Sequence, residues 1–213
     1  MTSGGRGDGW RRRAELYDRL APCYDVLIAP FEKLLLADAR LWAARIARGR
    51  TLEIGTGTGR TLAELRHALG AQAPAPVGVD VSLGMLTRAA ARTRALRATV
   101  IAADAARLPL AAATIDTAVS TLTLCAMPEP LAVLTEVRRV LRPDGQLVLI
   151  EHSTSSWRAI AALQRLLEHW TAPRFGEHLT REPEVLAAQA GFTIVHSEAR
   201  LGGIVRRVIA RPH

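Results

Sequence analysis

A glycine-rich loop runs from Glu53 to Gly59 with the sequence Glu-Ile-Gly-Thr-Gly-Thr-Gly. Glycines let the backbone approach a ligand closely, and a helix that follows such a loop presents unpaired N–H groups to an anionic part of the ligand. A dinucleotide fingerprint requires Gly-x-Gly-x-x-Gly, but the sixth position counted from Gly55 is Arg60. NAD and FAD are therefore disfavoured without being excluded. A tight strand-to-helix turn that binds nothing is the other alternative.

Acidic residues follow the loop at the boundaries of later strands. Asp80 ends the run 76–80, where a carboxylate is placed to accept hydrogen bonds from both hydroxyls of a ribose. Its alternative role is to cap the helix that starts near Ser82. Asp104 follows the next apolar run, and an acid there is placed to accept an adenine amino group. With Asp116 opening the fourth run, the loop and three acids in this order favour a site for S-adenosylmethionine (SAM).

Short apolar runs alternate with helical stretches through the middle of the chain. Runs near 51–54, 76–80, 98–102, 115–121 and 145–151 predict buried strands, and helices are expected at about 59–69, 82–95 and 129–141. This alternation predicts a parallel sheet with helices on both faces. Strands at Phe192–Arg200 and Ile204–Ala210, joined by Leu201-Gly202-Gly203, predict a closing antiparallel hairpin. The expected fold is α/β, Rossmann-like, with a seven-stranded, mostly parallel sheet.

Several boundaries in the chain are marked by proline, glycine or a capping residue. Helices are expected at Trp10–Leu20, from a break at Pro30 to about Ile46, at Trp157–Trp170 and at Arg181–Ala190 with Thr180 as its cap. Pro143-Asp144-Gly145 predicts a stop and a turn before the fifth strand. We expect one domain, in which residues 1–48 form a helical cap on a SAM-binding unit of residues 49–213.

These motifs resemble the class I SAM-dependent methyltransferases of the broad group that includes UbiE. The resemblance is carried by Glu53–Gly59, Asp80-Val81-Ser82, Asp104-Ala105, Asp116–Thr121, the segment 136–145 and the N-terminal segment 17–25. A closer similarity, to bacterial phosphatidylethanolamine N-methyltransferases and microsomal thiol methyltransferase-like proteins, rests on Thr121–Cys125, Glu151-His152, Gly176–Arg181, Gly202–Arg206 and Ala210–Pro212. Thr56 and Asp144 depart from residues common in these groups.

The resemblance implies SAM as methyl donor and S-adenosylhomocysteine as product. It implicates as cofactor-binding residues Tyr24, Glu53, Gly55, Thr56, Gly57, Thr58, Asp80, Val81, Asp104, Ala105 and Thr121. Tyr24 is expected to close over the methionine end of the cofactor. The acceptor is expected to be small and largely apolar: a phospholipid amine, a thiol or a specialised metabolite.

Methyl transfer from a sulfonium needs mainly an aligned nucleophile, and needs a base only when the acceptor must lose a proton. His152 follows the fifth strand at the edge where parallel sheets place their sites, which makes it the candidate base. Its alternative role is to satisfy loop backbone groups. Trp157, His169 and His178 are candidate acceptor contacts, and aromatic residues on a helix are equally consistent with a packing role. Cys125 is expected to be a wall residue, because no base is paired with it.

The 213 residues carry 28 basic and 20 acidic side chains, a formal charge of +8, and Lys33 is the only lysine. This arginine bias has two interpretations: a genomic composition, or a basic face for anionic lipid. An aromatic content of 4% without arginine–aromatic interleaving argues against nucleic acid. The two cysteines match no metal spacing, so no metal is expected. We expect a cytoplasmic protein, with peripheral membrane contact as an option.

Three functional interpretations stay open at this point. The favoured one is methyl transfer to a small acceptor. The second is a peripheral membrane protein whose Arg11-Arg12-Arg13 helix is the main functional feature. The third is a SAM-binding protein that uses the cofactor's charge for a rearrangement without methylation. The sequence predicts no oligomeric state.

Overall fold

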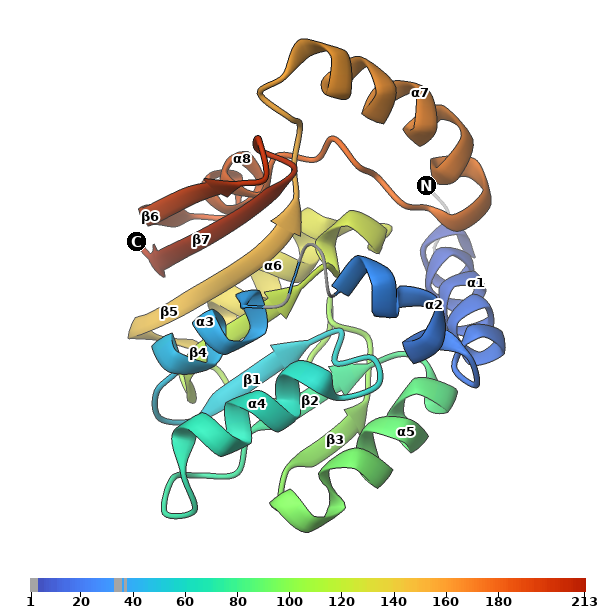
Figure 1. Ribbon diagram of the computed structural model, residues 1–213. Coiled ribbons are helices and arrows are strands. Elements are labelled where there is room, and N and C mark those ends of the chain that lie inside the picture. The colour runs from blue at the N-terminus through green and yellow to red at the C-terminus, as the bar shows by residue number, and fades with distance from the viewer. Residues whose placement is uncertain (1–3, 33–35, 37) are drawn as a thin grey trace.

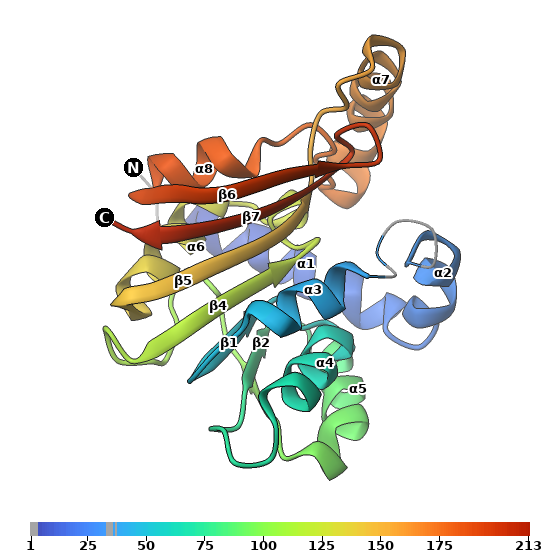
Figure 2. The ribbon, with the colours of Figure 1, turned by 60° about the vertical axis from the view of Figure 1, so that its left-hand side comes forward.

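The structure, a computed structural model, describes residues 4–32, 36 and 38–213. Its centre is one seven-stranded sheet in the order β3-β2-β1-β4-β5-β7-β6 (Figures 1 and 2). The strands are β1 (Thr51–Ile54), β2 (Val77–Asp80), β3 (Thr99–Ala102), β4 (Ile115–Thr121), β5 (Leu141–His152), β6 (Phe192–Arg200) and β7 (Val205–Pro212). The first five are parallel, while β7 runs antiparallel to both β5 and β6. This confirms the expected Rossmann-like plan.

Helices cover both faces of the sheet, because the central strands are apolar on both sides. The helices are α1 (Gly4–Leu20), α2 (Tyr24–Phe31), α3 (Ala39–Ile46), α4 (Arg60–Leu69), α5 (Leu83–Thr93), α6 (Pro130–Val140), α7 (Arg158–Phe175) and α8 (Pro183–Gln189). On one face, α6 and α8 bury Val133, Val137 and Ala187 against Leu147 and Leu149 of β5. On the other face, α3 and α4 pack on Val119, Val148 and Ile150.

The strand order reverses between β1 and β4, on whose outer sides β2 and β5 lie. Their registers pair Ile54 with Val79 on one side and with Ser120 on the other. Loops that leave the carboxyl ends of such neighbouring strands diverge to opposite faces of the sheet and leave a crevice between them. The glycine loop leaves β1 at this point, so the topology itself places it in the crevice.

The N-terminal helices α1 and α2 lie beyond the carboxyl ends of the parallel strands, whereas α3 packs on the sheet (Figure 1). Helix α7 stands apart from the sheet at the same end (Figures 1 and 2). No helix within the described part of the chain combines the length and the apolar character that a membrane crossing requires.

Two N-terminal expectations are corrected. Helix α1 begins at Gly4 rather than at Trp10, so the glycine-rich start is helical as well. Pro30 lies inside α2 instead of breaking the chain before the next helix. Because proline has no N–H, α2 lacks the hydrogen bond that this residue would donate to the carbonyl four residues earlier. The start of the helix expected up to Ile46 falls partly on residues 33–35 and 37, outside the described residues.

Two C-terminal expectations are corrected as well. Thr180 does not cap α8: Glu182 holds the N-cap position, Pro183 takes the first helical turn, and the Thr180 hydroxyl donates to Glu168 at 2.6 Å. The expected turn at 143–145 is a bulge, because β5 already begins at Leu141. Pairing of β5 with β4 shifts register there, from Ile115–Leu141 to Thr117–Gln146.

Candidate active site

The glycine loop has a backbone that only glycine adopts without strain. Gly55 has φ +64° and Gly57 has φ +53°, both in the left-handed region. A Cβ on Gly55 would lie 2.1 Å from Cγ2 of Thr123, so this position also needs a residue without a side chain. A Cβ on Gly57 would meet nothing within 4 Å, which leaves the backbone open on its ligand side. The loop is therefore shaped for close approach and not only for a turn.

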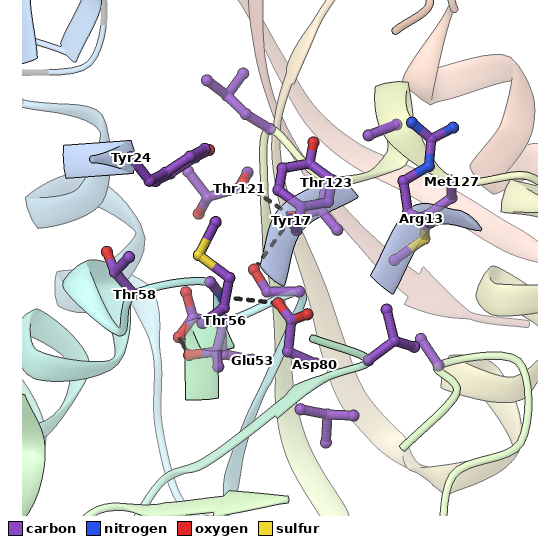
Figure 3. A pocket seen from close by; sticks show the side chains of 18 of the residues that line it. Arg13, Tyr17, Tyr24, Glu53, Thr56, Thr58, Asp80, Thr121, Thr123 and Met127 are labelled. Atoms are coloured by element: carbon purple, nitrogen blue, oxygen red, sulfur yellow. Dashed lines mark hydrogen bonds between the residues drawn. The ribbon is translucent and has the colours of Figure 1, made fainter. Parts of the chain in front are cut away.

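A cavity of about 820 Å³, solvent-open space included, lies over this loop. It is bounded by the loop, the ends of β2 and β4, and helices α1 and α2. Figure 3 shows the rings of Tyr17 and Tyr24 across the cavity from the carboxylates of Glu53 and Asp80. Apolar side chains supply much of the remaining wall: Ile28, Val79, Val81, Met85, Ala103, Ala105, Leu122, Ala126 and Met127.

Two carboxylates face this cavity from the ends of β1 and β2, the buried Glu53 and the half-buried Asp80. Oδ2 of Asp80 accepts from the Gly57 N–H at 2.9 Å and Oδ1 accepts from the Ser82 N–H at 2.9 Å. Burial raises the pKa of Asp80, against these hydrogen bonds. Burial also raises the pKa of Glu53 to about 7, although the Thr56 hydroxyl donates to Oε2 at 2.6 Å. A cation bound beside Glu53 would favour its ionised form.

Helix α2 is fastened to the glycine loop through Asp25. Its Oδ1 accepts from the Thr58 hydroxyl at 2.7 Å and from Arg60 Nε at 3.0 Å, and its Oδ2 accepts from Arg92 at 2.6 Å. Burial opposes ionisation of Asp25, but the hydrogen bonds from Arg92, Thr58 and Arg60 outweigh it and lower its pKa to about 2. The helical cap is thereby held closed over the cavity by charged hydrogen bonds.

Helix α1 has its own fastening, on the far side of the cavity. Oδ1 of Asp18 accepts from the Ser82 hydroxyl at 2.6 Å and from the Gly84 N–H at 2.8 Å, at the start of α5. The Ser82 hydroxyl also accepts from the Met85 N–H, so Ser82 is the residue that caps α5. Ser82 therefore takes the capping role that was the alternative for Asp80, and Asp80 faces the cavity.

A second cavity lies under the cap beside the first and shares Tyr17, Tyr24, Ile28, Arg40, Thr121 and Leu122 with it. We call it the inner chamber; its further lining includes Cys125, His152, Phe175 and Glu177. Burial lowers the pKa of His152, against the nearby Glu177 charge and a hydrogen bond with the Ile204 backbone. Burial, then Glu177, raises the pKa of the Cys125 thiol. At neutral pH the imidazole is mostly neutral and the thiol is protonated.

The wall between the two cavities is held by Glu151, which is fully buried at the end of β5. Its Oε1 accepts from the Ser120 hydroxyl at 2.8 Å and from the N–H groups of Thr123 and Leu124 at 3.1 Å. Burial raises the pKa of Glu151, against these donors. The segment carries Leu122 in a left-handed conformation, φ +49°. Such strain in a non-glycine residue persists only where the surroundings impose it.

The comparisons with known proteins agree with this geometry. Residues 52–149 match the family model described as "Methyltransferase domain". The chain is 31% identical to the ubiquinone/menaquinone biosynthesis C-methyltransferase UbiE of Syntrophotalea carbinolica, covering 89% of this chain and 90% of that one. The chain belongs to the class I SAM-dependent methyltransferases.

Other methyltransferases match it as well. The chain is 30% identical to the phosphatidylethanolamine N-methyltransferase of Cereibacter sphaeroides, over 73% of this chain and 80% of that one. A SAM-dependent methyltransferase from Thermotoga maritima has the same fold, with a TM-score of 0.71, 20% identity and coverage of 93% and 99%. The methyltransferase CalH, solved with S-adenosylhomocysteine, matches with a TM-score of 0.62 and 24% identity. The match covers 82% of this chain and 55% of the CalH chain.

The first cavity of this methyltransferase fits the donor that its family uses. The open backbone at Gly57 and the two carboxylates of Glu53 and Asp80 suit an amino acid moiety and a ribose, and the apolar wall suits an adenine ring. All predicted cofactor residues except Asp104 line this cavity. Asp104 carries no lining atom, and its Oδ1 accepts from the Ala106 N–H at 2.8 Å. Asp116 lies at the opposite end of the sheet, where Oδ2 accepts from the Arg50 N–H at 2.7 Å.

The predicted acceptor residues are not brought together. His152 lines the inner chamber, but the three other predicted residues lie outside the lining of both cavities. Trp157 is 62% exposed and covers Gly202, His169 is exposed on α7, and Nδ1 of His178 lies 3.1 Å from Glu168.

Sequence reasoning missed several residues of the site. Tyr17, Arg40, Met85 and Glu177 line it, and Asp25 closes it. Tyr17 and Asp25 stand in the N-terminal segment on which the family resemblance rests, and Glu177 stands next to His178 in another such segment. Membership of these segments was the sequence signal that could have identified the three residues. Only the fold shows which side chains of the segments face the cavities.

Proposed function

We propose that this SAM-dependent methyltransferase transfers the methyl group to a small, largely apolar acceptor that binds in the inner chamber. The supporting observation is the wall that both cavities share, which includes Tyr17, Tyr24, Thr121 and Leu122. A donor in the first cavity and an acceptor in the second would meet at this wall. The cap fastened by Asp18 and Asp25 excludes water from that meeting point.

Each part of the site has a role in this proposal. The cofactor, when bound, supplies an activated methyl group on a sulfonium with an excellent leaving group. Glu53 binds the amino group of its methionine part, and Asp80 holds the ribose hydroxyls while it anchors the glycine loop. Tyr24 closes the first cavity on the side opposite Glu53 and Asp80 (Figure 3). Positioning of the acceptor in line, roughly 3 Å from the methyl carbon, supplies most of the acceleration.

His152 is the proposed base for an acceptor that must lose a proton. Burial lowers its pKa, so the imidazole is ready to take a proton near neutral pH. It lines the same chamber as the acceptor, and no other histidine of the described chain does so.

Incubation with methyl-labelled SAM and an extract of the source cells, followed by mass spectrometry, tests the proposal. Labelled product and S-adenosylhomocysteine should appear in equal amounts. Consumption of substrate without S-adenosylhomocysteine would instead favour the non-methylating rearrangement, which no observation made so far supports.

We also propose peripheral contact with an anionic membrane, made chiefly by α7. Leu163, Leu166, Leu167 and Trp170 are 45–70% exposed and follow the spacing of one helical face. Three arginines of α7, Arg158, Arg165 and Arg174, are exposed beside them, a combination that suits anionic head groups.

This surface differs from the basic Arg11-Arg12-Arg13 turn that the sequence suggested. The Arg13 guanidinium donates to the backbone oxygens of Phe175 and Gly176, so it joins α1 to the end of α7. Only Arg11 and Arg12 are left exposed there.

Sedimentation with phosphatidylglycerol-containing vesicles tests the membrane proposal. Leu166→Glu should reduce vesicle binding at least about tenfold, because a charge on the apolar face opposes insertion. The matched control is Val185→Glu on α8, where Val185 is 52% exposed; it should bind like the wild type. Equal binding by both variants would contradict the proposal.

A further inference from the structure

Among the described residues, the inner chamber has one carboxylate whose charge is not balanced by an ion pair with a basic side chain. Its two acidic lining residues are Glu32 and Glu177. Glu32 accepts from both Arg40 and Arg60 in ion pairs, which neutralise it. Among the described residues, none with a basic side chain lies within 4.0 Å of the Glu177 carboxylate.

A neutral donor holds Glu177 in place instead. The Tyr17 hydroxyl donates to its Oε1 at 2.9 Å, and Cys125 lies close enough for Glu177 to raise the pKa of its thiol. Burial raises the pKa of Tyr17, Tyr24 and Cys125 most. For each of them the negative charge of Glu177 is the next largest cause of the increase. Tyr17, Tyr24 and Cys125 are thereby kept in their protonated forms, while burial keeps His152 neutral, so Glu177 gives the chamber a negative potential.

Three aromatic residues line the chamber together with Glu177. The rings of Tyr17 and Tyr24 lie 6.1 Å apart, centroid to centroid, at 68° to one another. Phe175 lines the chamber as well. The faces of aromatic rings attract cations, most strongly when water is excluded. A carboxylate among aromatic rings is the combination that recognises an organic ammonium ion.

We propose that the inner chamber selects an amine acceptor, bound as its ammonium ion against Glu177 and the rings of Tyr17 and Tyr24. This inference rests on the proposed function, because it names the acceptor class of the same chamber. Neutral phenols and thiols can donate a hydrogen bond to Glu177, as Tyr17 does, but they gain no charge pairing from it, and their nucleophilic anions are repelled by it. Methyl transfer to an acceptor oxygen or sulfur is therefore disfavoured relative to transfer to an amine nitrogen.

The proton and the electrons balance without any further reactant. The ammonium ion passes one proton to the neutral imidazole of His152, which frees the nitrogen lone pair. The nitrogen then attacks the methyl carbon: the nitrogen–carbon bond forms as the carbon–sulfur bond breaks, and the sulfur keeps the electron pair. The products are the N-methylated ammonium ion and S-adenosylhomocysteine, and His152 returns its proton to water.

Glu177 does not serve the cofactor sulfonium in this proposal. Its atoms line the inner chamber and not the cavity over the glycine loop. A role at the sulfonium would make S-adenosylmethionine bind more tightly than S-adenosylhomocysteine through Glu177. That difference is measurable, and it separates the two roles.

A pair of probes with the same shape tests the charge preference. Benzyltrimethylammonium is a permanent cation, and neopentylbenzene is its neutral carbon isostere. Calorimetric titrations of wild-type protein saturated with S-adenosylhomocysteine should show that the cation binds about tenfold to a hundredfold more tightly. The variant Glu177→Gln keeps an oxygen that accepts from Tyr17 and should remove this preference. Glu15→Gln, which removes an exposed charge on α1, should retain it.

The outcomes separate this inference from the proposed function. Failure of S-adenosylhomocysteine to bind would contradict the proposed function itself. Binding of S-adenosylhomocysteine without preference for the cation in the wild type would overturn the inference alone, and this result needs no variant to fold. A Glu177→Gln protein that keeps the preference, or that loses only the affinity for S-adenosylmethionine over S-adenosylhomocysteine, would also overturn it.

Discussion

The fastening of α2 to the glycine loop predicts a measurable cost when Asp25 is replaced by asparagine. The pKa of Asp25 is about 2 in the fold, against an ordinary value of 3.8. At about 1.4 kcal/mol per pH unit, this difference corresponds to about 2.4 kcal/mol of stabilisation. Arg60 and Arg92 keep 31% and 33% of their side chains exposed, so water screens part of it. We expect Asp25→Asn to lower the free energy of unfolding by about 1 to 2 kcal/mol.

The sign of the pH dependence follows from the lowered pKa. The contribution of Asp25 is fully present above the unfolded value near 4 and is lost as the pH falls towards 2. Urea denaturation of both proteins should therefore show a constant difference from pH 7 to about pH 4 and a narrowing difference below it.

The same substitution should weaken S-adenosylhomocysteine binding, because Thr58 and the cap lose a shared partner. Glu15→Gln, on the exposed side of α1, is the control and should change neither quantity. An Asp25→Asn protein with wild-type stability and wild-type affinity at pH 7 would refute the idea that this carboxylate holds the cap.

Three further substitutions test other parts of the site. His152→Gln should abolish the fall in kcat/KM that acidification produces in the wild type below pH 6.5, because burial lowers the pKa of that imidazole; an unchanged pH profile at wild-type turnover would mean no base there. Gly55→Ala should cost about 1 to 3 kcal/mol in urea denaturation, since its Cβ meets Thr123 in a left-handed backbone. Gly57→Ala should cost only about 1 kcal/mol, because open space lies above it, and should still weaken cofactor binding; equal costs would contradict the clash.

The sheet and the cofactor cavity were predictable because their signals are local. The glycine loop directly follows β1 and the acid directly ends β2, so the ends of these strands determine where both lie. The parallel topology brings those ends together. Gly55, Gly57 and Asp80 therefore lie where the sequence places them. The hairpin of β6 and β7 could be predicted in the same way, from two apolar runs and the short glycine-containing connection between them.

The inner chamber could not be predicted because its contacts are distant in the chain. Tyr17 and Glu177 are 160 residues apart and meet only because the cap folds over the sheet. Trp157 illustrates the converse: it stands five residues after His152, yet its ring covers Gly202 instead of turning into the chamber. Nothing in the local pattern distinguishes these two orientations.

The central claim is that SAM binds over the glycine loop with Asp80 on its ribose. Calorimetric titration with SAM and with NAD, on the wild type and on Asp80→Ala, tests it most directly. We expect one SAM per chain, no NAD binding, and a loss of SAM affinity of at least about tenfold in Asp80→Ala, since charged hydrogen bonds are removed. NAD binding by the wild type, or unchanged SAM affinity in Asp80→Ala, would contradict it.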